Sequence, residues 1–177
     1  GGRFWRCVAN RSPYFHIADR KCLQALSLID KLEKISLKVR GALQDIIEES
    51  DYVDCELSNF PSGSCEVSSV ILGLYLIELG IVNVVQTIGT RDVKGGMNRN
   101  NHVWLTVDGR YIVDITADQF DDCNTPVLVA ERTDFHDTFK IYECRQVERS
   151  YLIRRGSIGY AGVYSKLLEK LNALSAS

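Results

Sequence analysis

One stretch of the chain decides its fold: NHVWLTVDGRYIVDI, residues 101–115. Two runs rich in β-branched and aromatic side chains, at 102–107 and 110–115, flank the pair Asp108-Gly109. An Asp-Gly pair between two such runs is among the strongest short-range signals of a β-hairpin. We therefore predict two antiparallel strands here, joined by a tight turn.

The length of this turn decides whether His102 and Asp114 lie on the same face of the hairpin. A two-residue turn pairs His102 with Ile115 and places His102 and Asp114 on opposite faces. A three-residue loop at 107–109, with a bulge at the left-handed glycine, pairs His102 with Asp114 instead. Directly opposed side chains have Cβ atoms about 4.5–5.5 Å apart, close enough for a carboxylate to orient an imidazole. A site that uses both residues therefore requires the three-residue loop.

Upstream of the hairpin, a cysteine lies at the start of the clearest predicted helix. Residues 65–79 carry apolar side chains at helical spacing, with Ser62 or Ser64 available as N-cap and Gly80 as terminator. Cys65 then lies in the first turn, where unpaired N–H groups and the positive end of the helix dipole favour the thiolate. The same N–H groups point to where an oxyanion forms during attack on a carbonyl.

A thiol, an imidazole and a carboxylate are the components of a nucleophilic acyl-transfer site. In this interpretation Cys65 is the nucleophile, His102 is its base and later its acid, and Asp114 holds the imidazole. The alternative for each residue alone is structural, as a buried thiol or a hydrogen-bonded strand histidine. A carboxylate between two apolar strand residues needs a partner, however, which favours the catalytic hypothesis.

Four further residues are candidates for oxyanion or substrate binding: Asn59, Ser64, Trp104 and Gln119. Asn59 lies in the loop before the nucleophile, where an Asn is more often a turn former. Trp104 shares a strand face with the histidine and would shield it from water, although core packing explains it equally well. Gln119 follows the second strand in a polar stretch, either at a pocket rim or in a surface loop.

The two remaining histidines are weaker candidates for a base. His16 lies far upstream, and His136 lies in a polar segment near two aspartates, so we expect both to be solvated. Glu66, beside the nucleophile, is expected to stabilise the N-terminus of its helix.

The rest of the pattern places helices first, then an antiparallel sheet, then a closing helix, which is typical of the α+β class. Apolar residues recur at helical spacing over 18–49, where one helix bent at Gly41 and two separate helices fit equally well. Residues 1–15 are predicted to be irregular or a short edge strand, and 91–100 a polar loop that would be the place to look for a lid. Further strands are predicted at 84–88, 127–130 and 139–147. We expect a single domain over 1–177, with an N-terminal helical layer at 16–50, a catalytic core at 59–150 and a C-terminal helix at 158–175.

Composition is that of an ordinary globular protein, with 45% hydrophobic and 25% charged residues and a net charge of -2. This balance provides no positive electrostatic potential to attract nucleic acid or an anionic membrane. No apolar run approaches the roughly 20 residues of a membrane span. We therefore expect neither partner.

The six cysteines are scattered, without a C-x-x-C pair or a histidine at metal-ligand spacing, so we predict no metal and no cofactor. Three disulfides are an alternative, but a domain of this size does not need them, and we favour reduced thiols in a cytoplasmic setting. Gly1-Gly2 without a Met suggests a domain cut from a longer chain, and nothing at this end resembles a signal peptide.

Gly63-Ser64-Cys65 opening a helix, His102-x-Trp104 on a strand and Asp114 on the next strand resemble the transglutaminase-like branch of the papain-like cysteine enzyme superfamily. The resemblance covers about residues 60–120, and its specificity comes from the order and spacing of short parts. It implies a papain-like/transglutaminase-like fold, in which the nucleophile helix packs on an antiparallel sheet. It also implies chemistry on amide groups of a protein substrate through a thioester.

Within this superfamily, glutamine deamidation or transamidation is the first expectation and a cysteine protease or peptidase the alternative. Some small members are toxin or effector domains delivered into a target-cell cytoplasm, for which a cognate inhibitor or immunity protein would be a partner. Arylamine N-acetyltransferases are similar in the same residues but much longer, and the chain lacks the Ca²⁺ loop of the large animal transglutaminases. A non-catalytic protein-binding module is the alternative from another class, and the presence of all three triad residues argues against it.

Overall fold

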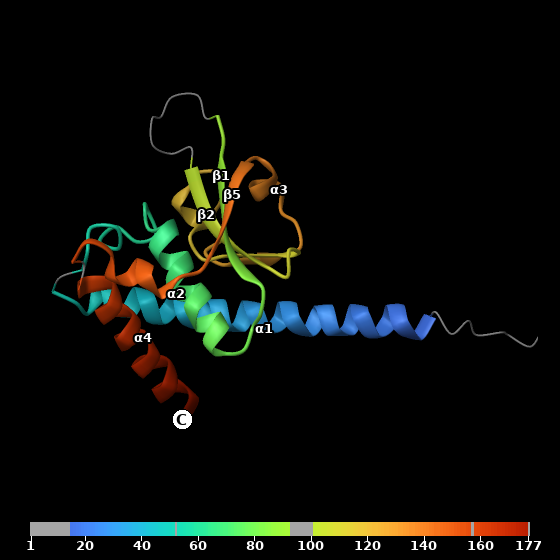
Figure 1. Ribbon diagram of the computed structural model, residues 1–177, viewed down its shortest axis with the longest axis horizontal. Helices are drawn as coiled ribbons and strands as arrows, with labels where there is room; N and C mark the ends of the chain where they lie inside the picture. Colours follow the sequence, from blue (N-terminus) through green and yellow to red (C-terminus); the bar gives the residue numbers. More distant parts are fainter. Residues whose placement is uncertain (1–14, 52, 93–100, 157, 177) are drawn as a thin grey trace, which may run out of the picture.

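The computed structural model describes residues 15–51, 53–92, 101–156 and 158–176. Helices and an antiparallel five-stranded sheet confirm the α+β class (Figure 1). The predicted N-terminal edge strand and most of the predicted lid loop lie outside the described residues. The α-helices are α1 (Phe15–Glu48), α2 (Cys65–Glu78), α3 (Asp134–Asp137) and α4 (Ile158–Ala176), and the 3-10 helices are η1 (Ala117–Gln119) and η2 (Arg149–Gly156). The strands are β1 (Val84–Thr90), β2 (Asn101–Val107), β3 (Tyr111–Asp114), β4 (Leu128–Ala130) and β5 (Lys140–Gln146).

The sheet has the order β4-β3-β2-β1-β5. The first four strands follow one another as antiparallel neighbours, and β5 returns to pair with β1 at the opposite edge from β4. Helices α1, α2 and α4 gather on one side of this sheet, whereas the short α3 lies near β1 and β5, away from them (Figure 1). The strands at 84–88, 127–130 and 139–147 were therefore predicted close to where they occur.

The N-terminal helical segment is one helix, because α1 continues through Gly41 to Glu48. Gly41 is exposed with no heavy atom within 4 Å of where its Cβ would stand, so neither packing nor backbone conformation requires a break there. Leu32, Val39 and Leu43 are fully buried at helical spacing and form the stripe that packs inward. In Figure 1 the N-terminal part of α1 extends well past the rest of the fold.

An aliphatic core fills the space between these helices and the sheet. Helix α2 contributes much of it, because most of its residues are buried, and α4 adds buried side chains such as Val163, Leu167 and Leu171. Leu105 and Val107 of β2 face this core from the sheet. Its fully buried members include Leu32, Val39, Leu43, Leu57, Val67, Val70, Ile71, Leu76, Leu105, Val107 and Leu167.

The hairpin turn differs by one residue from the predicted one. Val107 pairs with Tyr111, so the loop consists of Asp108, Gly109 and Arg110 rather than residues 107–109. Asp108 and Gly109 have φ angles of 53° and 62°. The N–H of Arg110 donates to the carbonyl of Val107 over 3.0 Å. These features describe a type I′ turn followed by one extra residue.

The position of the loop changes how His102 and Asp114 meet. Leu105 pairs with Val113, so Asp114 falls opposite Trp104. His102 lies two residues before Trp104 in β2. The prediction that His102 and Asp114 are directly opposed is therefore wrong. Because the loop still has three residues, both lie on the same face, where a diagonal pair is within reach of long side chains.

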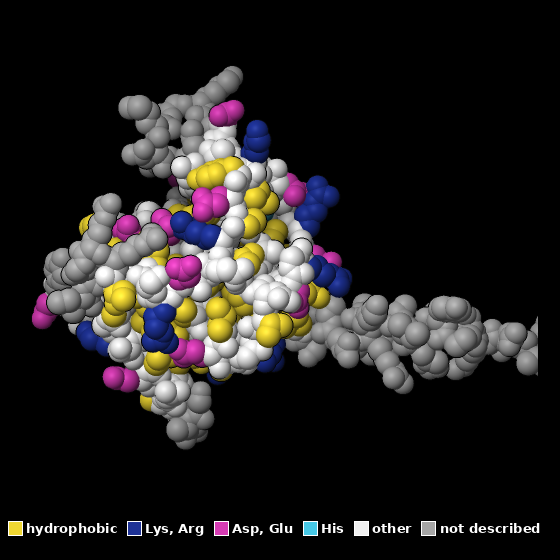
Figure 2. Space-filling model, viewed as in Figure 1, with side chains coloured by type: hydrophobic (Ala, Val, Ile, Leu, Met, Phe, Trp, Pro, Cys, Tyr) yellow, Lys and Arg dark blue, Asp and Glu magenta, His cyan; other side chains and the backbone are white. Residues whose placement is uncertain are grey.

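The surface carries charges of both signs without a large patch of one sign, as Figure 2 shows for one face. Among the described residues, no helix is both long enough and apolar enough to cross a membrane. Cys55, Cys65, Cys123 and Cys144 are free thiols, and the side chains of the other two cysteines are not described.

Candidate active site

Cys65 is the first residue of α2 and is partly buried. The residue before it, Ser64, is the N-cap, but its hydroxyl donates to the carbonyl of Pro61 over 2.8 Å and caps no helical N–H. Of the two predicted N-cap candidates, Ser62 and Ser64, the second holds the N-cap position, but its side chain does not cap the helix. The first N–H groups of α2 consequently keep no side-chain acceptor at the point where the Cys65 thiol stands.

His102 and Asp114 form a fully buried pair. Nε2 of His102 donates to Oδ2 of Asp114 over 2.6 Å, and both side chains are at most 1% exposed. The other carboxylate oxygen, Oδ1, accepts the backbone N–H of Thr116 at 2.8 Å and its hydroxyl at 3.2 Å. The sequence predicted that this carboxylate needs a partner, and the structure supplies several.

The electrostatics of this pair favour two opposite charges. Burial by itself lowers the pKa of His102, but the charge of Asp114 and its hydrogen bond, followed by contact with Cys65, raise that pKa to about 9. Burial by itself raises the pKa of Asp114, but the charge and hydrogen bond of His102, followed by His136, hold that pKa well below its usual range. At neutral pH the pair is therefore an imidazolium and a carboxylate.

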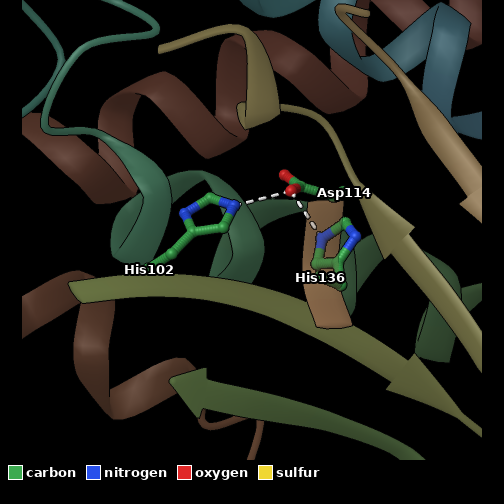
Figure 3. Close-up of side chains that lie close together, drawn as sticks. All are labelled: His102, Asp114 and His136. Carbon is green, nitrogen blue, oxygen red and sulfur yellow. Dashed lines mark hydrogen bonds and ion pairs between the residues drawn. The ribbon is translucent and has the colours of Figure 1, made fainter. Parts of the chain in front are cut away.

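His136 is the residue that sequence reasoning missed. It was expected to be solvated, but it is 4% exposed, and its Nε2 lies 3.0 Å from the same Oδ2 of Asp114 (Figure 3). Its Nδ1 lies 2.6 Å from Oγ1 of Thr133. Thr133 is the N-cap of the four-residue helix α3, and its hydroxyl oxygen accepts the backbone N–H of His136. The only signal in the sequence was this Thr-x-x-His spacing, which fixes a short cap but does not reveal burial.

Gln119 ties three parts of the site together. Its side-chain oxygen accepts the N–H of Gly63 at 3.2 Å, just before the nucleophile. Its side-chain nitrogen donates to the carbonyl of Thr116 at 2.9 Å and lies 3.3 Å from Nδ1 of His102. The donor on Gly63 and the acceptor on Thr116 fix which end of the amide is which. The candidate at 119 is therefore beside the histidine and not in a distant surface loop.

An aromatic cluster, defined here as Trp104, Phe120, Phe135 and Phe139, surrounds the imidazole of His102. The four ring centroids lie 5.0 to 5.9 Å from that of His102. Gly89, opposite His102 in β1, makes this possible, because a Cβ there would lie 2.9 Å from both Trp104 and Phe139. The cluster excludes water from the far side of the ion pair.

Arg91 covers the aromatic cluster from outside. Its guanidinium carbon lies 4.6 Å from the ring centroid of Phe139 and 4.9 Å from that of Phe120. Two of its nitrogens bind the carboxylate of Asp122 at 2.6 and 2.7 Å, and one also reaches Oγ1 of Thr138 at 3.1 Å. This arrangement places a cation over aromatic faces next to the site.

The other predicted residues occupy different positions. Asn59 is an exposed turn residue whose carbonyl accepts the N–H of Ser62, so its assignment as an oxyanion donor gains no support from its hydrogen bonds. Trp104 is buried against both His102 and His136. Glu66, in the first turn of α2 as expected, also forms an ion pair with Arg145.

His102, Asp114 and His136 also form a group that could ligate a metal ion, since one ligand atom of each lies within 4.8 Å of the others. Around a tetrahedral ion with bonds of about 2.0–2.1 Å, ligand atoms stand roughly 3.4 Å apart. The two nitrogens here lie 2.6 and 3.0 Å from the shared oxygen, which is hydrogen-bond spacing. The three groups are therefore placed to bind one another.

Comparisons of the chain with protein families, with curated proteins and with solved structures find no match, so the site is interpreted from its own geometry.

Proposed function

We propose that this protein is a cysteine-dependent acyl-transfer enzyme that acts on amide groups of a protein substrate through a thioester. One observation carries the proposal: the buried His102 binds Asp114 through Nε2 and also interacts with the thiol of Cys65 at the start of α2. A purely structural histidine does not need a thiol on one side and a buried carboxylate on the other. The papain-like/transglutaminase-like assignment of the fold belongs to the same proposal.

The first half of the reaction uses the nitrogen of His102 that Asp114 leaves available. Nε2 is committed to the carboxylate, so Nδ1 is the nitrogen that exchanges a proton with Cys65. The Cys65 thiolate attacks the carbonyl carbon of the amide and forms a tetrahedral intermediate. Nδ1–H then gives its proton to the leaving nitrogen, the C–N bond breaks, and ammonia or an amine departs from a thioester.

In the second half, Nδ1 takes a proton from an incoming water or amine, which attacks the thioester carbonyl. Collapse of the second tetrahedral intermediate breaks the C–S bond and returns the thiolate and the imidazolium. Asp114 stays ionised throughout and holds the ring, as its hydrogen bonds from Thr116 and the histidines favour. Water yields the acid, and an amine yields a new amide.

Two sets of donors are available to the oxyanion. The first N–H groups of α2 have no side-chain cap, and the positive end of the helix dipole lies there. Gln119 has one amide hydrogen on the carbonyl of Thr116, and its nitrogen also lies 3.3 Å from Nδ1 of His102. Because Nδ1 carries a proton when the oxyanion forms, it cannot accept the second amide hydrogen, which is then available to the reacting carbonyl. We therefore assign Gln119, rather than Asn59, as the side-chain oxyanion donor.

Among substrates, we propose the side-chain carboxamide of glutamine ahead of the peptide bond. Cleavage by a peptidase of the same fold is the alternative. The two differ in whether the reacting carbonyl belongs to a side chain or to the main chain, and the catalytic residues serve either.

The first test is the rate of alkylation by iodoacetamide at pH 6, followed by intact mass and peptide mapping. An ordinary thiol is almost entirely protonated at this pH, so an ion-paired thiolate reacts at least about tenfold faster. Cys144 is an internal control, because it is more exposed than Cys65. We expect fast labelling at Cys65 alone, its loss in His102→Ala, and its retention in the matched control His16→Ala.

Labelling of Cys144 as fast as that of Cys65, in protein whose circular dichroism shows it to be folded, would favour a non-catalytic binding module.

A second experiment separates the two substrate classes with a pair of affinity labels. One is a peptide that carries a diazomethyl ketone in place of the glutamine carboxamide, and the other carries it at its C-terminus. The proposal expects the glutamine analogue to inactivate Cys65 faster. Faster inactivation by the C-terminal label would assign the protein to the peptidases instead.

A further inference from the structure

The Asp114 carboxylate is shared by two histidines, and a three-residue site uses only one of them. Oδ2 lies 2.6 Å from Nε2 of His102 and 3.0 Å from Nε2 of His136, and all three side chains are buried (Figure 3). We propose that His136 is a positioning residue: by donating its Nε2–H to Asp114 it lowers the affinity of His102 for its proton. The catalytic consequence rests on the function proposed above.

The contacts of His136 define which of its nitrogens carries a proton. An ionised carboxylate accepts hydrogen bonds only, so Nε2 of His136 must carry a hydrogen toward Oδ2. The Thr133 hydroxyl oxygen already accepts the backbone N–H of His136 over 3.0 Å. Its own hydrogen is then available to Nδ1, 2.6 Å away. A neutral imidazole with its hydrogen on Nε2 satisfies every one of these contacts.

Helix α3 positions the side chain of His136 for this contact. It has only four residues, begins with the Thr133 cap, and presents His136 as its one buried side chain. The ring of His136 is held edge-on between Trp104, at 4.8 Å, and Phe135, at 5.0 Å between centroids. A ring in contact with two aromatic neighbours and bound at both nitrogens cannot turn away from Asp114 without breaking several contacts.

Sharing one oxygen between two donors changes what His102 can do. Each hydrogen bond to a carboxylate stabilises its negative charge and reduces its attraction for the next donor. If His102 were the only histidine bound to the carboxylate, Asp114 would stabilise the protonated form of His102 more strongly. His102 has to release Nδ1–H to the leaving group in every cycle, so a weaker hold favours its function as an acid.

Other charged or titratable groups also face this pair, and the experiment has to separate their effects from that of His136. They come from α2, from the segments that follow β1 and β3, and from α1: Cys65, Cys123, the ion pair of Arg91 with Asp122, and the ion pair of Arg40 with Asp118. None of them is altered in the variants below.

The test is an NMR titration of the imidazole of His102 in the whole chain, which holds only three histidines and is therefore simple to assign. In His136→Phe the ring is kept and the donor is lost, and we expect the pKa of His102 to rise by about one unit, a tenfold gain in proton affinity. In His136→Gln an amide N–H can replace Nε2–H, and we expect a shift of less than about 0.3 units.

A second pair of variants tests the same contact without changing the histidine. Thr133→Val removes the hydroxyl that holds Nδ1 and the cap of α3, and should raise the pKa of His102 by less than His136→Phe does. Thr133→Ser keeps the hydroxyl and should leave it unchanged. If His136→Phe does not fold, this pair decides the question.

An unchanged or lower pKa of His102 in both His136→Phe and Thr133→Val would overturn the proposal. The alkylation of Cys65 in the unaltered protein is read separately. Activated Cys65 with no effect of His136 rejects only this inference. A shifted His102 without activated Cys65 rejects the proposed enzyme and leaves the shared carboxylate established.

Discussion

On its helical side the sheet covers an interior made mainly of aliphatic side chains, whereas on the other side aromatic rings surround two histidines and a carboxylate. Adjacent residues of β2 point to opposite faces of the sheet, so Leu105 belongs to the aliphatic core and Trp104 to the aromatic cluster. The first region contributes stability through the area it buries, at every pH. The second adds a contribution that depends on pH, because its buried charges have to be paired, and it holds the chemistry.

The largest effect is expected in the aliphatic core. Leu105→Ala should lower the free energy of unfolding by about 2–5 kcal/mol, because a fully buried leucine leaves a cavity that the core cannot fill. Urea unfolding measures this loss. The matched control is Leu37→Ala, since Leu37 is 54% exposed on α1 and its truncation should cost less than about 0.5 kcal/mol.

As long as the Leu105→Ala variant is folded, its Cys65 should be alkylated at a rate within about twofold of that in the unaltered protein. A large change in that rate would show that the two regions are coupled and would weaken the comparison.

The next effect belongs to the histidine site and depends on pH. The folded-state pKa of His102 is about 9, above an unfolded value of about 6.5, so its contribution is complete below pH 6.5 and is lost as pH rises through 9. At about 1.4 kcal/mol per pH unit, the loss is on the order of 3 kcal/mol. Urea unfolding at a series of pH values measures it.

Two variants show whether this pH dependence comes from the site. His102→Gln should flatten the curve between pH 6.5 and 9, because it removes the titrating group. Leu105→Ala should give a curve parallel to that of the unaltered protein. A His102→Gln curve as steep as the original would assign the pH dependence to other groups.

The smallest effect is expected at the outer edge of the aromatic cluster. Arg91→Lys keeps the charge but loses the planar contact with the phenylalanine rings and the two-point bond to Asp122, at a cost of about 1 kcal/mol in unfolding free energy. Arg132→Lys is the control, because Arg132 is 80% exposed in its pair with Asp137 and should matter little. Equal effects would mean that the stacking over the rings contributes nothing.

The sequence predicted the parts of this molecule that repeat a regular pattern. Periodic apolar residues located α1, α2 and α4, and the run of residues 101–115 located the hairpin, because burial on one face imposes a spacing that can be counted. The same counting placed His102 and Asp114 on one face. It missed the loop by a residue, since Arg110 can stand in either the turn or the strand.

What the sequence could not predict is the surroundings of the carboxylate. His136 reaches Asp114 from a helix of four residues, and no period exists in so short an element. Gln119 is placed by contacts with Gly63 and Thr116, which are distant from each other in the chain and meet only in three dimensions. Such residues follow from tertiary packing, and their neighbours in sequence look like ordinary polar loops.

The contact between Trp104 and the buried histidines gives the protein an optical signal of its own. The indole ring centroid lies 5.7 Å from that of His102, and a protonated imidazole at this range quenches tryptophan emission, whereas a neutral one does so weakly. The chain has one other tryptophan, Trp5, which lies outside the described residues. Fluorescence from Trp104 therefore responds, without any label, to changes at the two buried histidines that its ring contacts.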